Sequence, residues 1–556
     1  MTQNSVLAII PARGGSKGIP RKNARFIANR PLISYAIQNA QLSRHIDRVV
    51  VSTDDDELVT IAKRYNCEAI LRPPELAADD IPLDPVIHHA VRDIESRESR
   101  RFDIVITLQP TSPLLSGKTM DRAIERFLDT QSDTLLSVVD DRHLSWTVRN
   151  DAYVPAYKER LNRQYLPPNF RETGGIVVSK REFVTQTGRF GPQIDLIEVN
   201  EKEAIDIDTR MDWWMAEKLL LRKRIIFRTD GYHQIGLGHI YRSLLLADRL
   251  IDHDLLFVTQ EKHQLGAEVL KKRHYPVKTI ESASDFETLI ENWCPDIIIN
   301  DILDTDPEYV EQLKDKGLFV VNFEDLGKGS HLADLVINAL YEEPLPLDNY
   351  YCGKHYYCLR EEFFLARPKV ITESVENIML SFGGVDTRDY TKRVLNIIEG
   401  MALENTHVTI IAGQGYAHKA ALEASIPSMK TPVTFMTDIK NISSYMENAD
   451  IIFTSAGRTV FEIASIGTPV IVMAQNNREL SHTFACRENG IINLGLGVEV
   501  SDETIRDTLS RLISDVALRR RCNALMKAHD LRSGIDNVLN LIFTSYEKSE
   551  KERASQ

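Results

Sequence analysis

The 556-residue sequence predicts an α/β protein whose sheets are mostly parallel. Short runs of β-branched residues alternate along the whole chain with longer amphipathic stretches, a pattern typical of strands joined by crossover helices. The alternation restarts near residue 222, where a new apolar run leads into a glycine-rich turn. Because one hydrophobic core rarely serves a chain of this length, we expect more than one domain.

We expect the first domain over residues 1–221, where helical or loop segments separate successive strands. The expected strands are VLAIIPA (6–12), RVVVST (48–53), EAILRP (68–73), DIVITLQP (103–110) and TLLSVVD (134–140). Helical spacing of apolar residues appears in 31–43 and 117–130. The segment MDWWMAEKLLLRK (211–223) reads as a closing helix with cationic residues at its carboxyl end.

The second part of the chain repeats this pattern and is long enough for two lobes, expected at 222–372 and 373–546. Its strands include LLFVT (255–259), DIIIND (296–301), LFVVNF (318–323), NIMLSFGG (377–384), HVTIIAG (407–413), DIIFTSAG (450–457) and PVIVMA (469–474). The last residues, 547–556, are polar, and we expect a frayed tail there.

Composition narrows the function. A chain that is 43% hydrophobic and 26% charged, with no apolar run near the roughly 18 residues of a membrane span, is expected to be soluble. Six scattered cysteines without a CxxC pair, and an amino terminus unlike a secretory signal, indicate a cytoplasmic protein. The net charge of −13 disfavours nucleic-acid partners. We expect small-molecule substrates, no membrane association and a homo-oligomer, specifically a dimer.

The segment IIPARGGSKGIPRKN (9–23) carries the first chemical signal. Glycines after a strand let the backbone wrap around an anion, and Arg13, Lys17, Arg21 and Lys22 place four cations within ten residues. A triphosphate needs this density of N–H groups and positive charge. A solvated basic loop is the alternative, and the spacing is not that of a Walker A loop.

The second signal is EAIDIDTRMDW (203–213). On a strand, Asp206 and Asp208 point to one face, where their oxygens suit Mg²⁺ and its bound phosphates. A solvated strand edge or a helix cap is the alternative, with Thr209 and Asp212 starting the next helix.

These segments, with VSTDD (51–55), LRPPELAADD (71–80), LQPTSPL (108–114) and IDIDT (205–209), resemble the acylneuraminate cytidylyltransferases, or CMP-sialic acid synthetases. The resemblance implies a Rossmann-like nucleotidyltransferase domain that uses CTP as co-substrate with a divalent cation. It assigns the CTP phosphates to Arg13, Ser16, Lys17 and Lys22. It places Asn23, Arg72 and Gln109 around the nucleotide, and the metal on Asp206 and Asp208, which we also expect to be catalytic.

The sugar side departs from that family. In RETGGIVVSKREF (171–183), Thr173 takes the usual Asn position and Val177 the usual Tyr position, and Leu115 stands where Arg is common. A diacetamido nonulosonic acid, such as legionaminic or pseudaminic acid, therefore fits as well as N-acetylneuraminic acid or better. We expect Arg171 to meet the sugar carboxylate and Thr173 to line the sugar pocket.

The second part opens with FRTDGYHQIGLGHIYR (227–242). Gly236 and Gly238 form a turn, and His239 stands at a helix amino terminus, which favours the neutral imidazole that a general base requires. A structural histidine is the alternative. The loops LSFGGVDT (380–387) and TSAGRTVFE (454–462) each open a helix that could hold a diphosphate, or are ordinary βα turns.

With VNFEDLG, LREEF and SAGRTVFEIASIGTPVIV, this part resembles the UDP-sugar hydrolases of pseudaminic-acid biosynthesis, within the two-lobed GT-B fold of MurG-type transferases. The resemblance implies that His239 activates water against the anomeric carbon of a UDP-linked diacetamido sugar. It places Gly238 beside that site, Asp230 and Arg242 near it, and UDP on Ser455, Gly457 and Glu462. Three hypotheses remain for this part: a hydrolase within a bifunctional enzyme, a glycosyltransferase, and a silent interaction or oligomerisation module.

Overall fold

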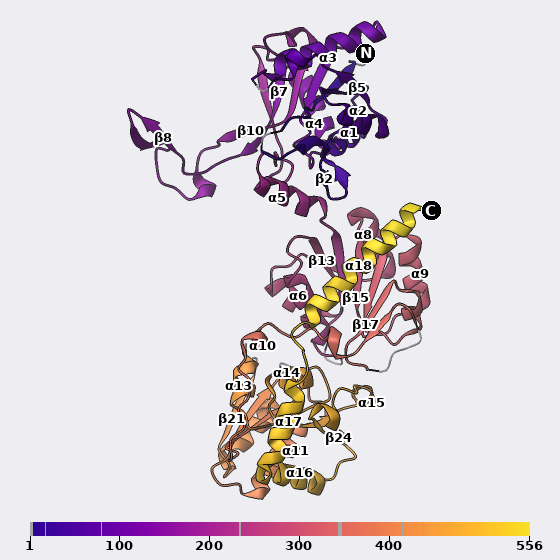
Figure 1. The fold of residues 1–556 in the computed structure, drawn as a ribbon. Coiled ribbons are helices and arrows are strands. Elements are labelled where there is room, and N and C mark those ends of the chain that lie inside the picture. The colour runs from indigo at the N-terminus through magenta and orange to yellow at the C-terminus, as the bar shows by residue number, and fades with distance from the viewer. Residues whose placement is uncertain are drawn as a thin grey trace. The chain divides into compact units, whose positions relative to one another are not determined.

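The computed structural model (Figure 1) divides into two compact units, Met1–Arg222 and Lys223–Gln556. It describes residues 4–16, 18–78, 80–232, 235–342, 347–413, 415–437, 439 and 441–555. Both units are α/β with mostly parallel sheets, so the predicted fold class is confirmed. Among the described residues, no helix is long and apolar enough to cross a bilayer.

Unit 1 is built on a seven-stranded sheet with the order β11-β7-β10-β6-β1-β4-β5. All neighbours are parallel except β10, which runs antiparallel to both β6 and β7. The strands are β1 Val6–Pro11, β4 Arg48–Thr53, β5 Glu68–Leu71, β6 Ile104–Leu108, β7 Thr134–Asp140, β10 Phe170–Lys180 and β11 Ile194–Glu198. The helices are α1 Leu32–Gln41, α2 Asp56–Arg64, α3 Leu83–Glu98, α4 Gly117–Thr130 and α5 Arg210–Leu220, and β2 Phe26–Ile27 pairs with β3 Arg30–Pro31.

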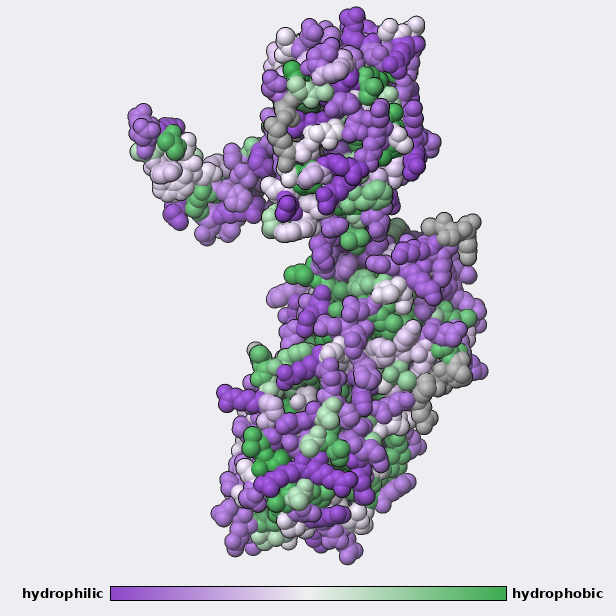
Figure 2. Space-filling view, viewed as in Figure 1, coloured by the Kyte–Doolittle hydropathy of each residue, from purple (hydrophilic) through white to green (hydrophobic). Residues whose placement is uncertain are grey.

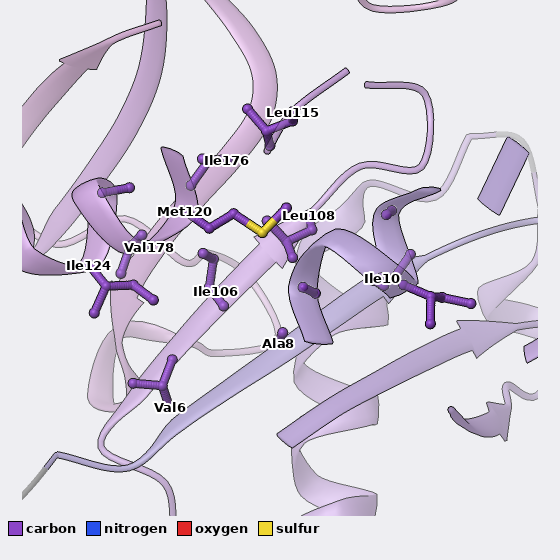
Figure 3. Packing of buried hydrophobic residues seen from close by; sticks show 14 of the residues in the cluster. Val6, Ala8, Ile10, Ile106, Leu108, Leu115, Met120, Ile124, Ile176 and Val178 are labelled. Atoms are coloured by element: carbon purple, nitrogen blue, oxygen red, sulfur yellow. The ribbon is translucent and has the colours of Figure 1, made fainter. Parts of the chain in front are cut away.

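The sheet of unit 1 is buried on both faces, because alternate residues of each central strand enter different cores. Val6, Ala8 and Ile10 of β1 pack with β6, β10 and α4 (Figure 3), whereas Leu7 and Ile9 pack against α3. Burial on two faces explains why these strands are continuous apolar runs in the sequence. Because β1, β4 and β6 run parallel, their carboxyl ends share one edge of the sheet, and ligands bind at this edge in such sheets.

A hairpin arm of β8 Trp146–Arg149 and β9 Ala152–Pro155 extends from unit 1 (Figure 1). Every residue of its two strands is exposed except Val154, which is half-buried. The sequence predicted no strand in this arm, because the arm has no core that would impose a periodic pattern of apolar residues.

Unit 2 contains two all-parallel sheets, as the two-lobed GT-B-like prediction requires. The first has the order β14-β13-β12-β15-β16-β17-β18 and the second β21-β20-β19-β22-β23-β24. The first-lobe elements are β12 Arg224–Thr229, α6 Gly238–Asp248, β13 Asp254–Gln260, α7 Gln264–Lys272, β14 Val277–Ile280, α8 Ala283–Trp293, β15 Ile297–Asp301, α9 Pro307–Asp315, β16 Phe319–Phe323, β17 Leu335–Asn338 and β18 Tyr350–Cys352. The short helix α10 Glu362–Leu365 precedes the expected boundary at residue 372, but its Phe363 is buried in the core of the second sheet, so the division between the lobes lies earlier in the chain than expected. The second-lobe elements are β19 Asn377–Ser381, α11 Tyr390–Met401, β20 His407–Ala412, α12 Lys419–Ser425, β21 Val433–Thr437, α13 Ile442–Asn448, β22 Ile451–Thr454, α14 Thr459–Ile466, β23 Val470–Ala474, α15 Asn477–Leu480, β24 Ile492–Leu496, α16 Asp502–Ser514 and α17 Val516–Lys527.

The carboxyl-terminal helix α18, Gly534–Ser555, corrects two expectations. Residues up to 546 were expected in the second lobe, but Ile535, Val538, Ile542 and Tyr546 are buried in the core of the first sheet. The frayed tail expected over 547–556 is helical to Ser555. The helix persists because its apolar stripe is anchored on β16 and β17, which stabilises the polar turns that follow.

Candidate active sites

The basic loop after β1 is folded back on itself at the carboxyl edge of the sheet. The buried Asn23 donates from Nδ2 to the carbonyl of Arg13 (3.0 Å), and the Gly14 N–H donates to Asp54 Oδ1 (3.1 Å). A Cβ on Gly14 would lie 2.3 Å from Asp55 Oδ2, so this position has no room for a side chain. Ser16 is half-buried in the same loop, and Lys17 lies outside the described residues.

The loop is held against the segment that contains the two aspartates. Lys22 Nζ donates to the carbonyl of Ile207 (2.5 Å) and contacts Asp208 Oδ1 (3.2 Å). The Ile207 N–H donates to the carbonyl of Thr111 (2.9 Å), which brings the TSP segment to the same place. Three segments that the sequence places far apart therefore meet at the edge formed by β1, β4 and β6.

The strand expected at residues 205–208 is wrong, because this segment is irregular and leads into α5. Thr209 caps that helix in a capping box with Asp212, as the alternative hypothesis for those two residues predicted. Without a strand, the two carboxylates are not equivalent. The Asp208 side chain is 74% exposed, whereas Asp206 is half-buried, and burial raises the pKa of its carboxyl.

Several of the segments that carry the sequence motifs of unit 1 contain a buried polar atom without a hydrogen-bond partner. Such atoms are rare in folded proteins, since each loses its hydration without compensation. Among the described residues they include Asn23 Oδ1, Ser52 Oγ, Arg72 Nε, Ser112 Oγ and Asp206 Oδ1. Ser52 and Ser112 were not singled out from the sequence, although both stand inside the matched segments VSTDD and LQPTSPL. Acceptors and donors left open in this way fit a polar ligand such as a nucleotide.

The donor set also fits a hard divalent cation. Asp206 Oδ1 is buried and unpartnered, and carboxylate oxygens are preferred Mg²⁺ ligands. Within the described residues no three His, Cys, Asp or Glu side chains gather as a metal site. Magnesium commonly takes one or two protein carboxylates and completes its shell with phosphate oxygens and water, so Asp206 and Asp208 suffice for that role.

In the segment expected to line the sugar pocket, Thr173 is buried and its hydroxyl is already hydrogen-bonded within the protein. Its Oγ1 lies 2.7 Å from Ser137 Oγ, at the irregularity where β10 shifts register against β7. Val177 and Leu115 are also buried, whereas Arg171 is exposed on β10, with Nε 4.0 Å from Asp141 Oδ1. Gln109 stands at the end of β6, and its Nε2 lies 3.3 Å from where a Cβ of Gly174 would be.

In unit 2, the amino terminus of α6 meets the carboxyl ends of β15 and β16. His239 Nδ1 lies 2.5 Å from Asp301 Oδ1, and Arg242 binds both oxygens of Asp301, with Nε 2.8 Å from Oδ2. Arg242 also donates from Nη1 to Glu324 Oε1 (2.8 Å). Burial alone would raise the pKa of Asp301, but Arg242 and His239 hold it well below its usual range.

This cluster contains two acidic residues that the sequence hypothesis missed. Asp301 ends the run DIIIND and Glu324 follows LFVVNF, so each stands at the carboxyl end of a parallel strand. That position is the available signal, because ligands bind at this edge. Asp230, expected beside His239, instead contacts Arg228, His263 and Thr259. Arg242 lies as expected within reach of His239.

The loop that follows β22 supplies the candidate nucleotide residues of the second lobe. Ser455 is buried, and Gly457 has only Ser455 Oγ and Glu479 Oε1 near its Cβ position. Glu479 Oε2 accepts from the N–H groups of Ala456 (3.3 Å) and Gln475 (2.8 Å), which fixes the loop. Glu462 is buried and paired with Arg360 through both carboxylate oxygens (2.7 and 3.0 Å).

A basic glycine loop held against the Asp206–Asp208 segment at the carboxyl ends of β1 and β6 is an arrangement typical of nucleotide-binding domains. Residues 7–173 match the family model described as cytidylyltransferase, and residues 378–487 match the glycosyltransferase family 28 C-terminal domain. The chain belongs to the cytidylyltransferase family, with a family 28-like domain after it.

Two relatives of the first unit are matched over nearly their full length and a third over about half of its length. The post-translational flagellin modification protein B of Campylobacter coli is 31% identical over 40% of this chain and 97% of its own. The pseudaminic acid cytidylyltransferase of Campylobacter jejuni is 32% identical over 38% of this chain and 95% of its own. The N-acylneuraminate cytidylyltransferase A of Danio rerio is 32% identical over 39% of this chain and 51% of its own. Among solved structures, Acinetobacter baumannii MurG matches 58% of this chain and 99% of its own at 14% identity and a TM-score of 0.45.

Proposed function

We propose that unit 1 transfers CMP from CTP to the anomeric hydroxyl of a sialic-acid-like 2-keto sugar acid. The observation that carries this proposal is the set of buried atoms without hydrogen-bond partners in the matched segments, which includes Ser52 Oγ and Asp206 Oδ1. The sugar oxygen bonds to the α-phosphorus, the bond to the bridging oxygen breaks, and diphosphate leaves with the sugar proton going to solvent or a base. The chain's task is to position the reactants and to neutralise charge.

The roles of individual residues in unit 1 follow from their positions. Arg13, Ser16, Lys17 and Lys22 would bind the CTP phosphates, with Lys22 exchanging its contact to Asp208 for a phosphate oxygen. Asn23, Arg72 and Gln109 would contact the nucleotide. Asp206 and Asp208 would hold Mg²⁺, which neutralises phosphate charge when bound.

For the acceptor, we propose a diacetamido nonulosonic acid, of the pseudaminic or legionaminic type, in preference to N-acetylneuraminic acid. The name of the Campylobacter jejuni relative supports this substrate class. The burial of Thr173 and Val177 supports it also, since neither can present the polar Asn and Tyr groups that the neuraminate pocket would use. Arg171 is exposed and would bind the sugar carboxylate.

We propose that unit 2 hydrolyses a UDP-linked diacetamido sugar to UDP and the free sugar. The observation that carries this is the contact between His239 Nδ1 and Asp301, which directs Nε2 away from the carboxylate as the group that takes a proton from water. The water oxygen bonds to the anomeric carbon, and UDP leaves with the electrons of the broken C–O bond. Ser455, Gly457 and Glu462 would hold UDP, although Glu462 already binds Arg360.

A glycosyltransferase is the second candidate for unit 2, favoured by the family 28 match at residues 378–487. The two functions separate in one assay: UDP is released from the UDP-sugar by a hydrolase in water alone, but by a transferase only when an acceptor is added. A silent module would release none under either condition and would not bind UDP.

We also propose a cytoplasmic homodimer that pairs through the arm of β8 and β9. An isolated two-stranded hairpin is marginally stable in water, and this one exposes Trp146, Val148 and Tyr153 at 57%, 58% and 81%. Figure 2 shows hydrophilic and hydrophobic residues mixed on the surface of the arm. Sedimentation of the wild type and of Tyr153→Glu tests the pairing. We expect a dimer that dissociates in the variant, and a monomeric wild type would contradict the proposal.

A further inference from the structure

Two groups of opposite charge in unit 2, the buried Glu324 and the half-buried Arg458, each leave one buried side-chain atom without a hydrogen-bond partner. They are Glu324 Oε2, in the first lobe, and Arg458 Nη1, at the amino end of α14 in the second. No ion pair joins them in the described part of the chain, although the charge of Arg458 acts on the Glu324 carboxyl. A buried polar atom without a hydrogen-bond partner is costly, so one open acceptor and one open donor indicate a missing group.

Glu324 is held in place by several contacts, which include a backbone hydrogen bond from Leu340 to its carboxyl. Its Oε1 accepts from Arg242, its N–H donates to Ile337, and its carbonyl accepts from Arg478 Nη2 of the second lobe (3.0 Å). Its φ is +50°, in the left-handed region that a residue with a side chain rarely adopts. Such conformations persist where the surroundings over-determine them, and they concentrate at binding sites.

Arg458 is fixed in the same way. Its Nη2 donates to the carbonyl of Cys358 (3.0 Å), and its guanidinium lies 4.9 Å from the ring centre of Tyr357. Its Cδ lies 3.4 Å from where a Cβ of Gly238 would be, so the arginine reaches the residue that precedes His239. Arg458 also directly follows the loop Ser455–Gly457. It therefore connects the proposed nucleotide loop to the proposed catalytic histidine.

We infer that Glu324 and Arg458 form the subsite for the sugar phosphate of a sugar nucleotide, an inference that rests on the hydrolase function proposed for unit 2. Glu324 Oε2 accepts a hydrogen bond from a hydroxyl or acetamido N–H of the sugar. Arg458 Nη1 binds an oxygen of the phosphate that carries the sugar. A ligand with a donor on one side and an anionic oxygen on the other satisfies both atoms, and it lies next to His239.

The test uses the full chain and two binding titrations in the His239→Asn background, where the substrate survives. In Glu324→Gln the side chain keeps an oxygen for Arg242 but loses the acceptor at the second position. We expect the dissociation constant of the UDP-linked diacetamido sugar to rise about tenfold or more, while that of UDP changes less than about twofold. Arg458→Met should weaken both ligands by about tenfold or more.

Glu311→Gln, an exposed residue of α9, is the matched control, and melting curves verify that each variant is folded. Unchanged binding of the UDP-sugar in folded Glu324→Gln and Arg458→Met would overturn the subsite while leaving the hydrolase proposal intact. A parent protein that binds neither UDP nor the UDP-sugar would instead refute the proposed function itself. If Glu324→Gln does not fold, the Arg458→Met titrations decide alone. An Arg458→Met protein that binds UDP and the UDP-sugar as tightly as the parent protein does would then reject the inference.

Discussion

Replacing Asp301 with Asn separates the structural and catalytic roles of the buried cluster in unit 2. In the wild type, the carboxylate binds Arg242 through both oxygens and accepts from His239. The Asp301→Asn change leaves Arg242 with Glu324 as its one described carboxylate partner, and breaking a buried pair in this way costs about 3–5 kcal/mol. It also replaces an acceptor-only carboxylate with an amide that can donate to His239 Nδ1 and so no longer fixes the histidine tautomer, and hydrolysis should therefore fall about 10²–10⁴-fold.

The pH dependence of the stability difference follows from the depressed pKa of Asp301. A carboxylate whose folded pKa lies below its unfolded value of about 3.9 stabilises the protein above that value and loses this contribution as the pH falls through the folded pKa. The difference in unfolding free energy between wild type and Asp301→Asn should therefore be constant from about pH 5 to 8 and shrink in stronger acid.

The assays are UDP release from the UDP-linked diacetamido sugar and denaturant unfolding of unit 2. Asp315→Asn, an exposed position in α9, is the control for the substitution. CTP turnover by unit 1 of the same sample is the control for intact protein. An Asp301→Asn protein with wild-type stability and wild-type hydrolysis would refute the reasoning, because it would mean that the buried carboxylate neither balances Arg242 nor orients His239.

Three further predictions concern other parts of the chain. Asp206→Asn or Asp208→Asn should lower CMP-sugar formation by orders of magnitude and leave UDP-sugar hydrolysis unchanged; full synthetase activity in both would remove the pair from the mechanism. His239→Asn should lose about 10²–10⁴-fold in hydrolysis with UDP affinity retained by calorimetry; a normal rate would favour the transferase or silent hypothesis. Deleting 534–556 should unfold unit 2 at a lower denaturant concentration, because four buried side chains leave the first core; an unchanged midpoint would contradict that packing.

Most of the fold could be predicted because each central strand is buried on both faces of its sheet and is therefore a continuous apolar run. Such runs are visible in the sequence without any tertiary information. The basic glycine loop at residues 9–23 stands out in the sequence for a similar reason, since four cations beside glycines in an acidic chain have few structural explanations, and its role in binding phosphates stays a prediction. The antiparallel direction of β10 was not predictable, because direction is set by connections and pairing rather than by composition.

The parts that sequence reasoning missed depend on contacts between distant residues. Asp301 is 62 positions from His239, and nothing local distinguishes it from other aspartates that end strands. Thr173 matched a pocket position in the sequence, but a register shift in β10 turns it toward Ser137. The polar end of α18 looked like a frayed tail because the anchor that keeps it helical lies in the first sheet.

The most direct test of the account is diphosphate release by the full chain with CTP and Mg²⁺ over a panel of sugar acids. The panel comprises N-acetylneuraminic, legionaminic and pseudaminic acids, each assayed for kcat/KM. We predict turnover that requires a sugar, with a diacetamido acid preferred over N-acetylneuraminic acid. A kcat/KM for N-acetylneuraminic acid about tenfold higher than for either diacetamido acid, a transition-state difference of about 1.4 kcal/mol, would contradict the proposed acceptor. No diphosphate release with any member of the panel would contradict the central claim.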